Sequence, residues 1–65
     1  MMKIDNKKLY AAMATNGLTG AALSQKTGVS RNVVTKILKG GHTCRADVIG
    51  KICGALNIEP KELIE

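Results

Sequence analysis

Aromatic residues are almost absent from this chain of 65 residues. Tyr10 is the only one, and the sequence has neither phenylalanine nor tryptophan. Hydrophobic residues nevertheless make up 45% of the chain, so its core must be built from leucine, isoleucine, valine, alanine and methionine. An aliphatic mixture of this kind favours helices over strands. The short length predicts one small domain spanning residues 1–65.

Long apolar runs are missing as well. No stretch approaches the roughly 18 residues that cross a membrane, and the start, MMKIDNKKLYAAM, lacks the apolar centre of a signal peptide. We therefore expect a cytoplasmic protein with no membrane contact. Placed on one helix, Cys44 and Cys53 would lie about 13 Å apart on opposite sides, which excludes an intramolecular disulfide. Cys53 is expected in the core, and Cys44 as a partly exposed thiol.

The residues that catalysis or metal binding requires are also scarce. The single histidine, His42, forms with Cys44 and Cys53 no common zinc pattern, so neither a metal nor a cofactor is expected. Asp47 is better explained as a favourable charge in the first turn of a helix than as a catalytic acid. Without a nucleophile beside a base, a carboxylate pair or a phosphate-binding loop, the chain is not expected to be an enzyme.

No acidic residue occurs between Asn6 and Ala46. Residues 1–46 carry eight lysines and arginines against one aspartate, whereas residues 47–65 carry two lysines against four acidic residues. The net charge of +5 is therefore concentrated in the first two thirds of the chain. A cationic field that is not neutralised locally attracts polyanions, which indicates a nucleic acid partner.

The stretch GVSRNVVTKILKGG, residues 28–41, concentrates this charge on one helix face. At 100° per residue, the polar side chains of residues 31–39 fall within an arc of about 140° and the four aliphatic side chains of that span fill the opposite arc. The polar set is Arg31, Asn32, Thr35, Lys36 and Lys39. An isolated basic face is most simply a solvated surface. The charge distribution of the whole chain favours an acidic partner instead.

Cap and turn residues divide the chain into five short helical segments, with no alternation long enough for paired strands. N-caps are expected at Asp5, Thr19 and Ser30, and helix ends at Gly17, Gly28, Gly40 and Asn57. A fourth helix should begin near residues 43–45 and bury Ala46, Ile49, Ile52, Cys53 and Leu56. Pro60 should open a final turn. Met1 and Met2 are expected to be frayed.

Two short helices joined by a turn of three to four residues, the second one polar, are typical of a helix-turn-helix. The stretch LTGAALSQKTGVSRNVVTKILKGG resembles the Cro and phage-repressor type (XRE-like) family, in which L-T-Q-x-x-L-A-x-x-x-G-V-S-x-x-x-I-S-x-x-x-x-G recurs. The matching positions are Leu18, Thr19, Leu23, Ser24, Gly28, Val29, Ser30, Val34, Ile37 and Gly40. The stretch DVIGKICGALNIEPKELI is similar to the family's fourth and fifth helices.

The resemblance implies an all-α, lambda-repressor-like domain of four to five helices, with its helix-turn-helix at about 19–39. It also implies that a recognition helix, about 30–39, enters the major groove. Base contacts would come from Arg31, Asn32, Thr35 and Lys36, and backbone contacts from Thr19, Gly20, Lys39, His42 and Thr43. Gly20 replaces the family's usual glutamine, so phosphate contact there would depend on backbone amides.

The expected function is that of a sequence-specific regulator of transcription, repressor-like and of prokaryotic or phage type, bound to double-stranded DNA. A two-fold operator and a homodimer would fit the small interface of one domain, with Ile58, Leu63 and Ile64 as the apolar contacts. The alternative is a protein-interaction module, such as an antitoxin or an accessory subunit, with the same fold. Affinity of the isolated protein for duplex DNA distinguishes the two.

Overall fold

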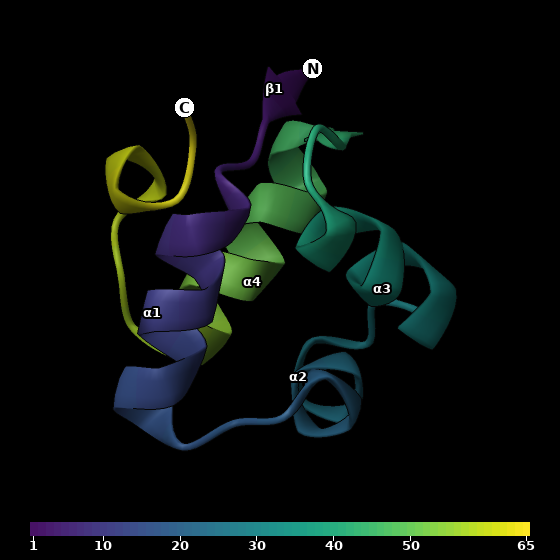
Figure 1. Cartoon of the computed structure of the whole chain (residues 1–65), viewed down its shortest axis with the longest axis vertical. Coiled ribbons are helices and arrows are strands. Elements are labelled where there is room, and N and C mark those ends of the chain that lie inside the picture. The colour runs from purple at the N-terminus through teal and green to yellow at the C-terminus, as the bar shows by residue number, and fades with distance from the viewer.

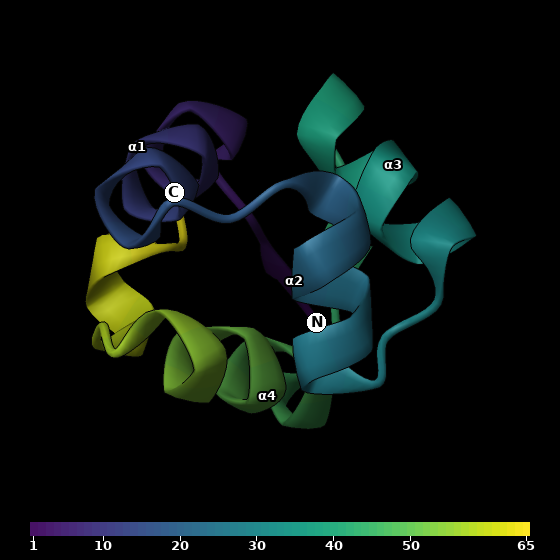
Figure 2. The same ribbon diagram turned by 90° about the horizontal axis from the view of Figure 1, so that it is seen from below.

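Four α-helices and a short two-stranded ribbon make up the computed structural model, which describes all 65 residues (Figure 1). Their order is β1 (Met2–Lys3), α1 (Asn6–Asn16), α2 (Gly20–Thr27), α3 (Arg31–Lys39), β2 (Thr43–Cys44), α4 (Ala46–Leu56) and a 3-10 turn, η1 (Pro60–Glu62). The helices surround one central region (Figure 2). The all-α class is thus confirmed. None of the helices is both long and apolar enough to cross a membrane.

Local sequence explains where most helices begin and end. The three expected N-caps are confirmed, because a side-chain oxygen accepts a backbone hydrogen bond at Asp5, Thr19 and Ser30. Residues in the left-handed conformation end α1, α2 and α4, at Gly17, Gly28 and Asn57. Caps of this kind satisfy amides and carbonyls that a helix leaves free at its ends.

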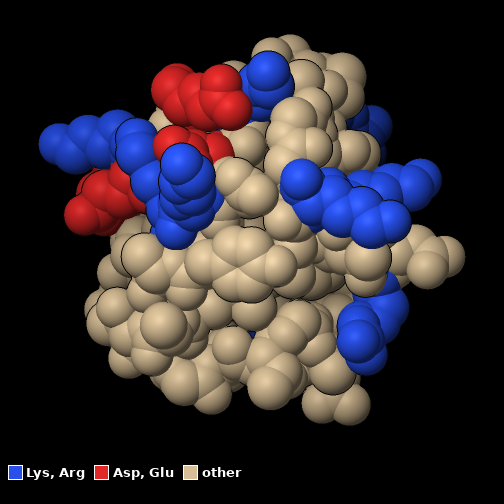
Figure 3. Space-filling view, in the orientation of Figure 1, with Lys and Arg blue, Asp and Glu red and all other residues tan.

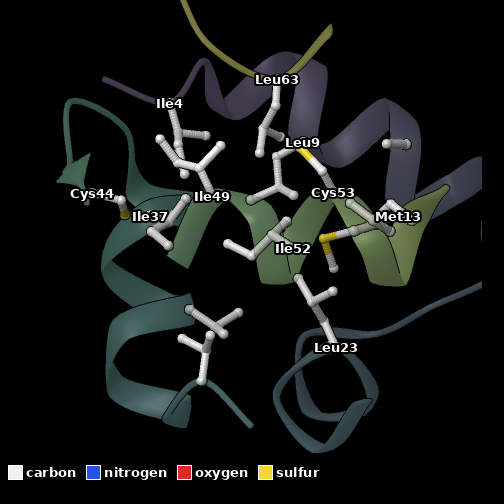
Figure 4. Close-up of a cluster of buried hydrophobic side chains, with 14 residues drawn as sticks. Ile4, Leu9, Met13, Leu23, Ile37, Cys44, Ile49, Ile52, Cys53 and Leu63 are labelled. Carbon is white, nitrogen blue, oxygen red and sulfur yellow. The ribbon is translucent and has the colours of Figure 1, made fainter. Parts of the chain in front are cut away.

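The core contains 14 buried residues, all apolar (Figure 4). They are Ile4, Leu9, Ala12, Met13, Leu23, Val29, Val34, Ile37, Cys44, Ile49, Ile52, Cys53, Leu56 and Leu63. Two expectations about burial were wrong. Cys44 is only 4% exposed and belongs to the core cluster, so its thiol is not partly exposed. Ala46 is exposed because it is the first residue of α4, ahead of the turn that reaches the core.

The paired strands are a further correction. Met2 pairs with Cys44 and Lys3 with Thr43 in an antiparallel ribbon, and Ile4 forms a bridge to Ile64. The expectation that Met2 is frayed was therefore wrong, whereas Met1 is 83% exposed. Segments of two residues carry no alternation that a sequence pattern can detect, and their partners lie about forty positions away.

The C-terminal turn closes the core rather than offering a free surface. Leu63 has no exposed area, and its carbonyl oxygen accepts a hydrogen bond from the Asp5 amide at 2.9 Å. The expectation that Leu63 contacts a second copy was therefore wrong, because its side chain already packs in the monomer's core. Ile58 and Ile64 are partly buried against the same core.

Candidate nucleic-acid interface

The turn between α2 and α3 is fixed by hydrogen bonds from side chains. The Ser24 hydroxyl donates to the carbonyl oxygen of Val29 at 2.6 Å, and the Thr27 hydroxyl accepts from the Val29 amide at 3.1 Å. Gly28 adopts φ +77°, a left-handed conformation that glycine reaches without steric cost. Val29 is buried and attaches the turn to the core. These contacts set α3 at a defined angle to α2.

The helix α3 has one face in the core and one in solvent. Val34 and Ile37 are each 1% exposed, with Val33 and Leu38 partly buried beside them. The expected base-contacting residues all lie on the exposed face: Arg31, Asn32, Thr35 and Lys36. The Thr35 hydroxyl donates to the Arg31 carbonyl at 2.9 Å, so its proton is already used within the helix.

The expected backbone-contacting residues lie in two segments, the start of α2 and the residues that end and follow α3. Thr19 is exposed, and its hydroxyl caps α2 by accepting from the Ala22 amide at 3.1 Å. Gly20 is partly buried, and a Cβ there would lie 3.6 Å from Leu38 Cδ1, so the first turn of α2 packs directly on α3. In the segment that ends and follows α3, Lys39 and Thr43 are exposed and His42 is partly buried between them.

Charge is distributed unevenly over the surface (Figure 3). On the face shown, the basic side chains on the side where α3 lies have no acidic neighbours, whereas the acidic side chains gather near the C-terminal turn together with other basic ones. No residue of α3 is acidic, and its last turn contains Lys36 and Lys39. The side of the molecule that presents α3 is therefore the electropositive one.

The two cysteine thiols are buried and weakly reactive. Burial raises the pKa of Cys44 above its ordinary value. Burial also raises the pKa of Cys53, and the negative charges of Glu59 and Glu62 add to that effect. Both cysteines are free, and no group of three or more histidine, cysteine or acidic residues is placed to hold a metal ion. Neither thiol is placed to act as a nucleophile at neutral pH.

The sequence of residues 8–65 matches the family model of the Cro/C1-type helix-turn-helix DNA-binding domain. The chain belongs to this family. In this Cro/C1-type domain, α2 and α3 are the helix-turn-helix, and the resemblance carried by Leu18 to Gly40 is confirmed. No curated protein matches the chain.

Solved structures similar to this Cro/C1-type domain include two proteins of gene control. The restriction-modification controller protein C.AhdI from Aeromonas hydrophila is 28% identical, with a TM-score of 0.79 over 88% of this chain and 86% of that one. The transcriptional regulator VanUg is 25% identical, with a TM-score of 0.81 over 98% of this chain and 84% of that one. The fold and its helix order are thus shared along nearly the whole chain.

One cation beside this surface was missed by sequence reasoning. The Lys3 side chain passes next to the loop after α3, with its Cε 4.0 Å from where a Cβ of Gly41 would lie. Its ammonium group lies 4.0 Å from the carboxylate of Glu65. The pairing of β1 with β2 brings Lys3 to this loop, and a sequence pattern does not reveal that pairing. The only signal in the sequence was the general excess of positive charge in residues 1–46.

Proposed function

We propose that this protein is a sequence-specific regulator of transcription that binds double-stranded DNA and acts in the manner of a repressor. The observation that carries the proposal is the composition of the exposed face of α3. Arginine, asparagine, threonine and two lysines project from it, without a carboxylate, while Val34 and Ile37 hold the opposite face in the core. A helix so anchored fits the major groove of B-DNA.

The residues at the start of α3 suit the reading of bases. Arg31 has two parallel donors that match O6 and N7 of guanine, and Asn32 has the donor and acceptor that match adenine. The methyl group of Thr35 can contact the methyl group of thymine, and Lys36 can reach guanine or a phosphate. We assign base recognition to these four residues.

Contacts with the DNA backbone are assigned to two segments, the start of α2 and the residues that end and follow α3. Lys39, His42 and Thr43 lie together after α3, and Thr19 and Gly20 lie at the first turn of α2. A helix N-terminus carries a partial positive charge that suits a phosphate. Backbone contacts of this kind fix the orientation of the recognition helix without reading sequence.

Two copies on a two-fold operator would supply the affinity that one small domain lacks. A single domain of this size buries about 600–1,000 Å² of protein surface on DNA, which is little for tight binding. Ile58 and Ile64 are the apolar residues near the C-terminus that retain some exposed area, and we assign the contact between copies to them. Occupying the operator would then block transcription. The control functions named for C.AhdI and VanUg support this role.

The test is selection of bound sequences from a random pool of double-stranded DNA at about 0.15 M salt, where non-specific contacts are screened. Enrichment of an inverted repeat, with guanine and adenine in each half-site, is the expected result. Retention of DNA without enrichment would overturn sequence-specific regulation. A protein that retains no duplex at all would instead favour a module that binds another protein.

A further inference from the structure

The first residue of α1 holds the last turn of α3. The side-chain amide of Asn6 donates a hydrogen bond from Nδ2 to the carbonyl oxygen of Leu38, at 3.1 Å and in a partly buried position. The last four carbonyls of a helix have no partner within that helix. Asn6 therefore satisfies an end group of α3 from another helix, 32 residues earlier in the chain.

Gly40, the first residue of the loop that follows α3, lies next to the side chain of Asn6. A Cβ at Gly40 would lie 3.2 Å from Asn6 Nδ2, which is tighter than ordinary contact. Gly40 also has φ +101°, which side-chain-bearing residues rarely adopt. The absence of a side chain at Gly40 thus lets the backbone approach Asn6 closely.

A second hydrogen bond holds the far side of this loop. The Ile4 amide donates to the carbonyl oxygen of His42 at 3.2 Å, and the pairing of Lys3 with Thr43 follows directly. Residues 4 and 6 thus hold the backbone on both sides of Gly40 and Gly41. The loop would otherwise have two glycines and little burial to restrain it.

We propose that Asn6 is a positioning residue for DNA binding, which orders the segment Lys39–Thr43 before the DNA arrives. This inference rests on the proposed function, because Lys39, His42 and Thr43 of that segment are assigned to contacts with the DNA backbone. Asn6 itself is not assigned a DNA contact. A loop that is already ordered loses less conformational entropy on binding, and so binds more tightly for the same contacts.

The other end of α1 provides a matched control. Asn16 donates from Nδ2 to the carbonyl oxygen of Leu56 at 3.1 Å, and to that of Ala12 at 2.8 Å. This amide therefore joins α1 to the end of α4 in the way that Asn6 joins it to the end of α3. Replacing Asn16 by alanine removes a comparable contact but leaves the loop after α3 untouched.

The experiment compares the full chain with Asn6→Ala and Asn16→Ala, at a temperature where urea titrations show all three to be folded. Affinity is measured for the selected duplex, and backbone mobility of residues 40–43 is measured by ¹⁵N relaxation and amide exchange in the free protein. We expect Asn6→Ala to mobilise the loop and to bind every duplex about three- to tenfold more weakly, with unchanged base preference. Asn16→Ala should stay within about twofold of the unaltered chain on both readouts.

Equal loss of affinity in the two variants, or a loop that stays rigid in Asn6→Ala, would overturn the positioning role. If Asn6→Ala does not fold, Asn6→Asp serves instead, because a carboxylate favours the N-terminus of α1 but has no N–H to donate to Leu38. Its loop should be mobile too, and a rigid loop would overturn the proposal. If the unaltered chain retains no DNA, the proposed function fails while the mobility measurement still tests the Asn6 contact.

Discussion

The Ser24 hydroxyl and the Val29 carbonyl oxygen lie 2.6 Å apart, joined by a hydrogen bond across the turn of the helix-turn-helix. Ser24 belongs to α2 and Val29 directly precedes the cap of α3, so this one bond relates the two helices. Both groups are partly buried, where an unpaired carbonyl is costly. The serine at this position therefore has a polar role in the turn.

Replacing Ser24 by alanine should lower the free energy of unfolding by about 1 kcal/mol, because the Val29 carbonyl loses its side-chain donor. Urea denaturation followed by circular dichroism measures this change. Thr15→Ala is the control, because its hydroxyl donates to the Ala11 carbonyl at an exposed site, and alanine favours helices. An Ser24→Ala protein as stable as the Thr15→Ala protein would contradict the importance of the bond.

Replacing a glycine by alanine should change the stability of the fold in opposite directions within α4 and at the end of α2. Gly54 is exposed in α4 with open space around its Cβ position, so Gly54→Ala should stabilise the fold by about 0.5–1 kcal/mol. Gly28 has φ +77°, so Gly28→Ala should destabilise it by about 1–2 kcal/mol despite equally open space. Thermal unfolding of both variants checks the sign. A shared sign would show that backbone conformation does not control these sites.

The C-terminal turn should contribute to stability through Leu63. Its side chain has no exposed area, so Leu63→Ala should lower the free energy of unfolding by about 2–5 kcal/mol. That is a large share of the stability of so small a domain. Ile64→Ala should cost less, because Ile64 is only partly buried. Chemical denaturation gives both values, and sedimentation measures self-association of the same samples. A Leu63→Ala protein of normal stability with weakened association would restore the interface role that the structure excludes.

The proposed DNA contacts predict two kinds of effect on binding. Arg31→Ala should weaken the free energy of DNA binding by about 1–3 kcal/mol and relax the preference at one base position, because it removes a bidentate donor. Lys39→Ala should weaken binding to all DNA sequences alike, because it removes a phosphate contact. The slope of log K against the logarithm of the salt concentration should become shallower by about one unit. Fluorescence anisotropy with matched and mismatched duplexes over a salt series separates the two.

Lys61→Ala is the control for charge, because Lys61 lies in η1 between Glu59 and Glu62 in the sequence, and η1 lies away from α3 (Figure 1). It should leave base preference and the salt slope close to those of the unaltered chain. An Arg31→Ala protein with unchanged base preference would contradict the assignment of Arg31.

The buried thiols predict the behaviour of the fold in alkali. The pKa of Cys44 and that of Cys53 are raised in the native state, so the unfolded chain loses these protons first as the pH rises. Stability contributed by the protonated thiols is thus complete below pH about 8 and declines above about 9. Urea midpoints at a series of pH values test this. Cys44→Ala and Cys53→Ala together should flatten the decline, and an unchanged slope would contradict it.

Most of the helices could be predicted because their signals are local. Asp5, Thr19 and Ser30 cap helices through bonds to amides two or three positions ahead, which any reader of the sequence can locate. The aliphatic face of α3 could be predicted from the helical spacing of its apolar residues, and Val34 and Ile37 are indeed buried. The candidate base-contacting residues are exposed because they occupy the other arc of the same helix.

The remaining features arise from contacts between distant segments. Nothing near Cys44 in the sequence indicates that Met2 will pair with it, and nothing near Leu63 indicates that it will close the core beside Asp5. The Asn6 contact with Leu38 likewise joins positions 32 residues apart. A sequence pattern records the local environment of each residue but not the pairing of segments.

The sequence by itself determined the helices, their caps, the apolar face of each and the cationic face of α3, because these depend on neighbours within one or two turns. The tertiary structure decided which backbone lies against the loop after α3, that Cys44 is buried as well as Cys53, and which end of the chain closes the core. The physical reason is that hydrogen bonds such as Asn6 to Leu38, and burial such as that of Leu63, exist only after the helices have packed.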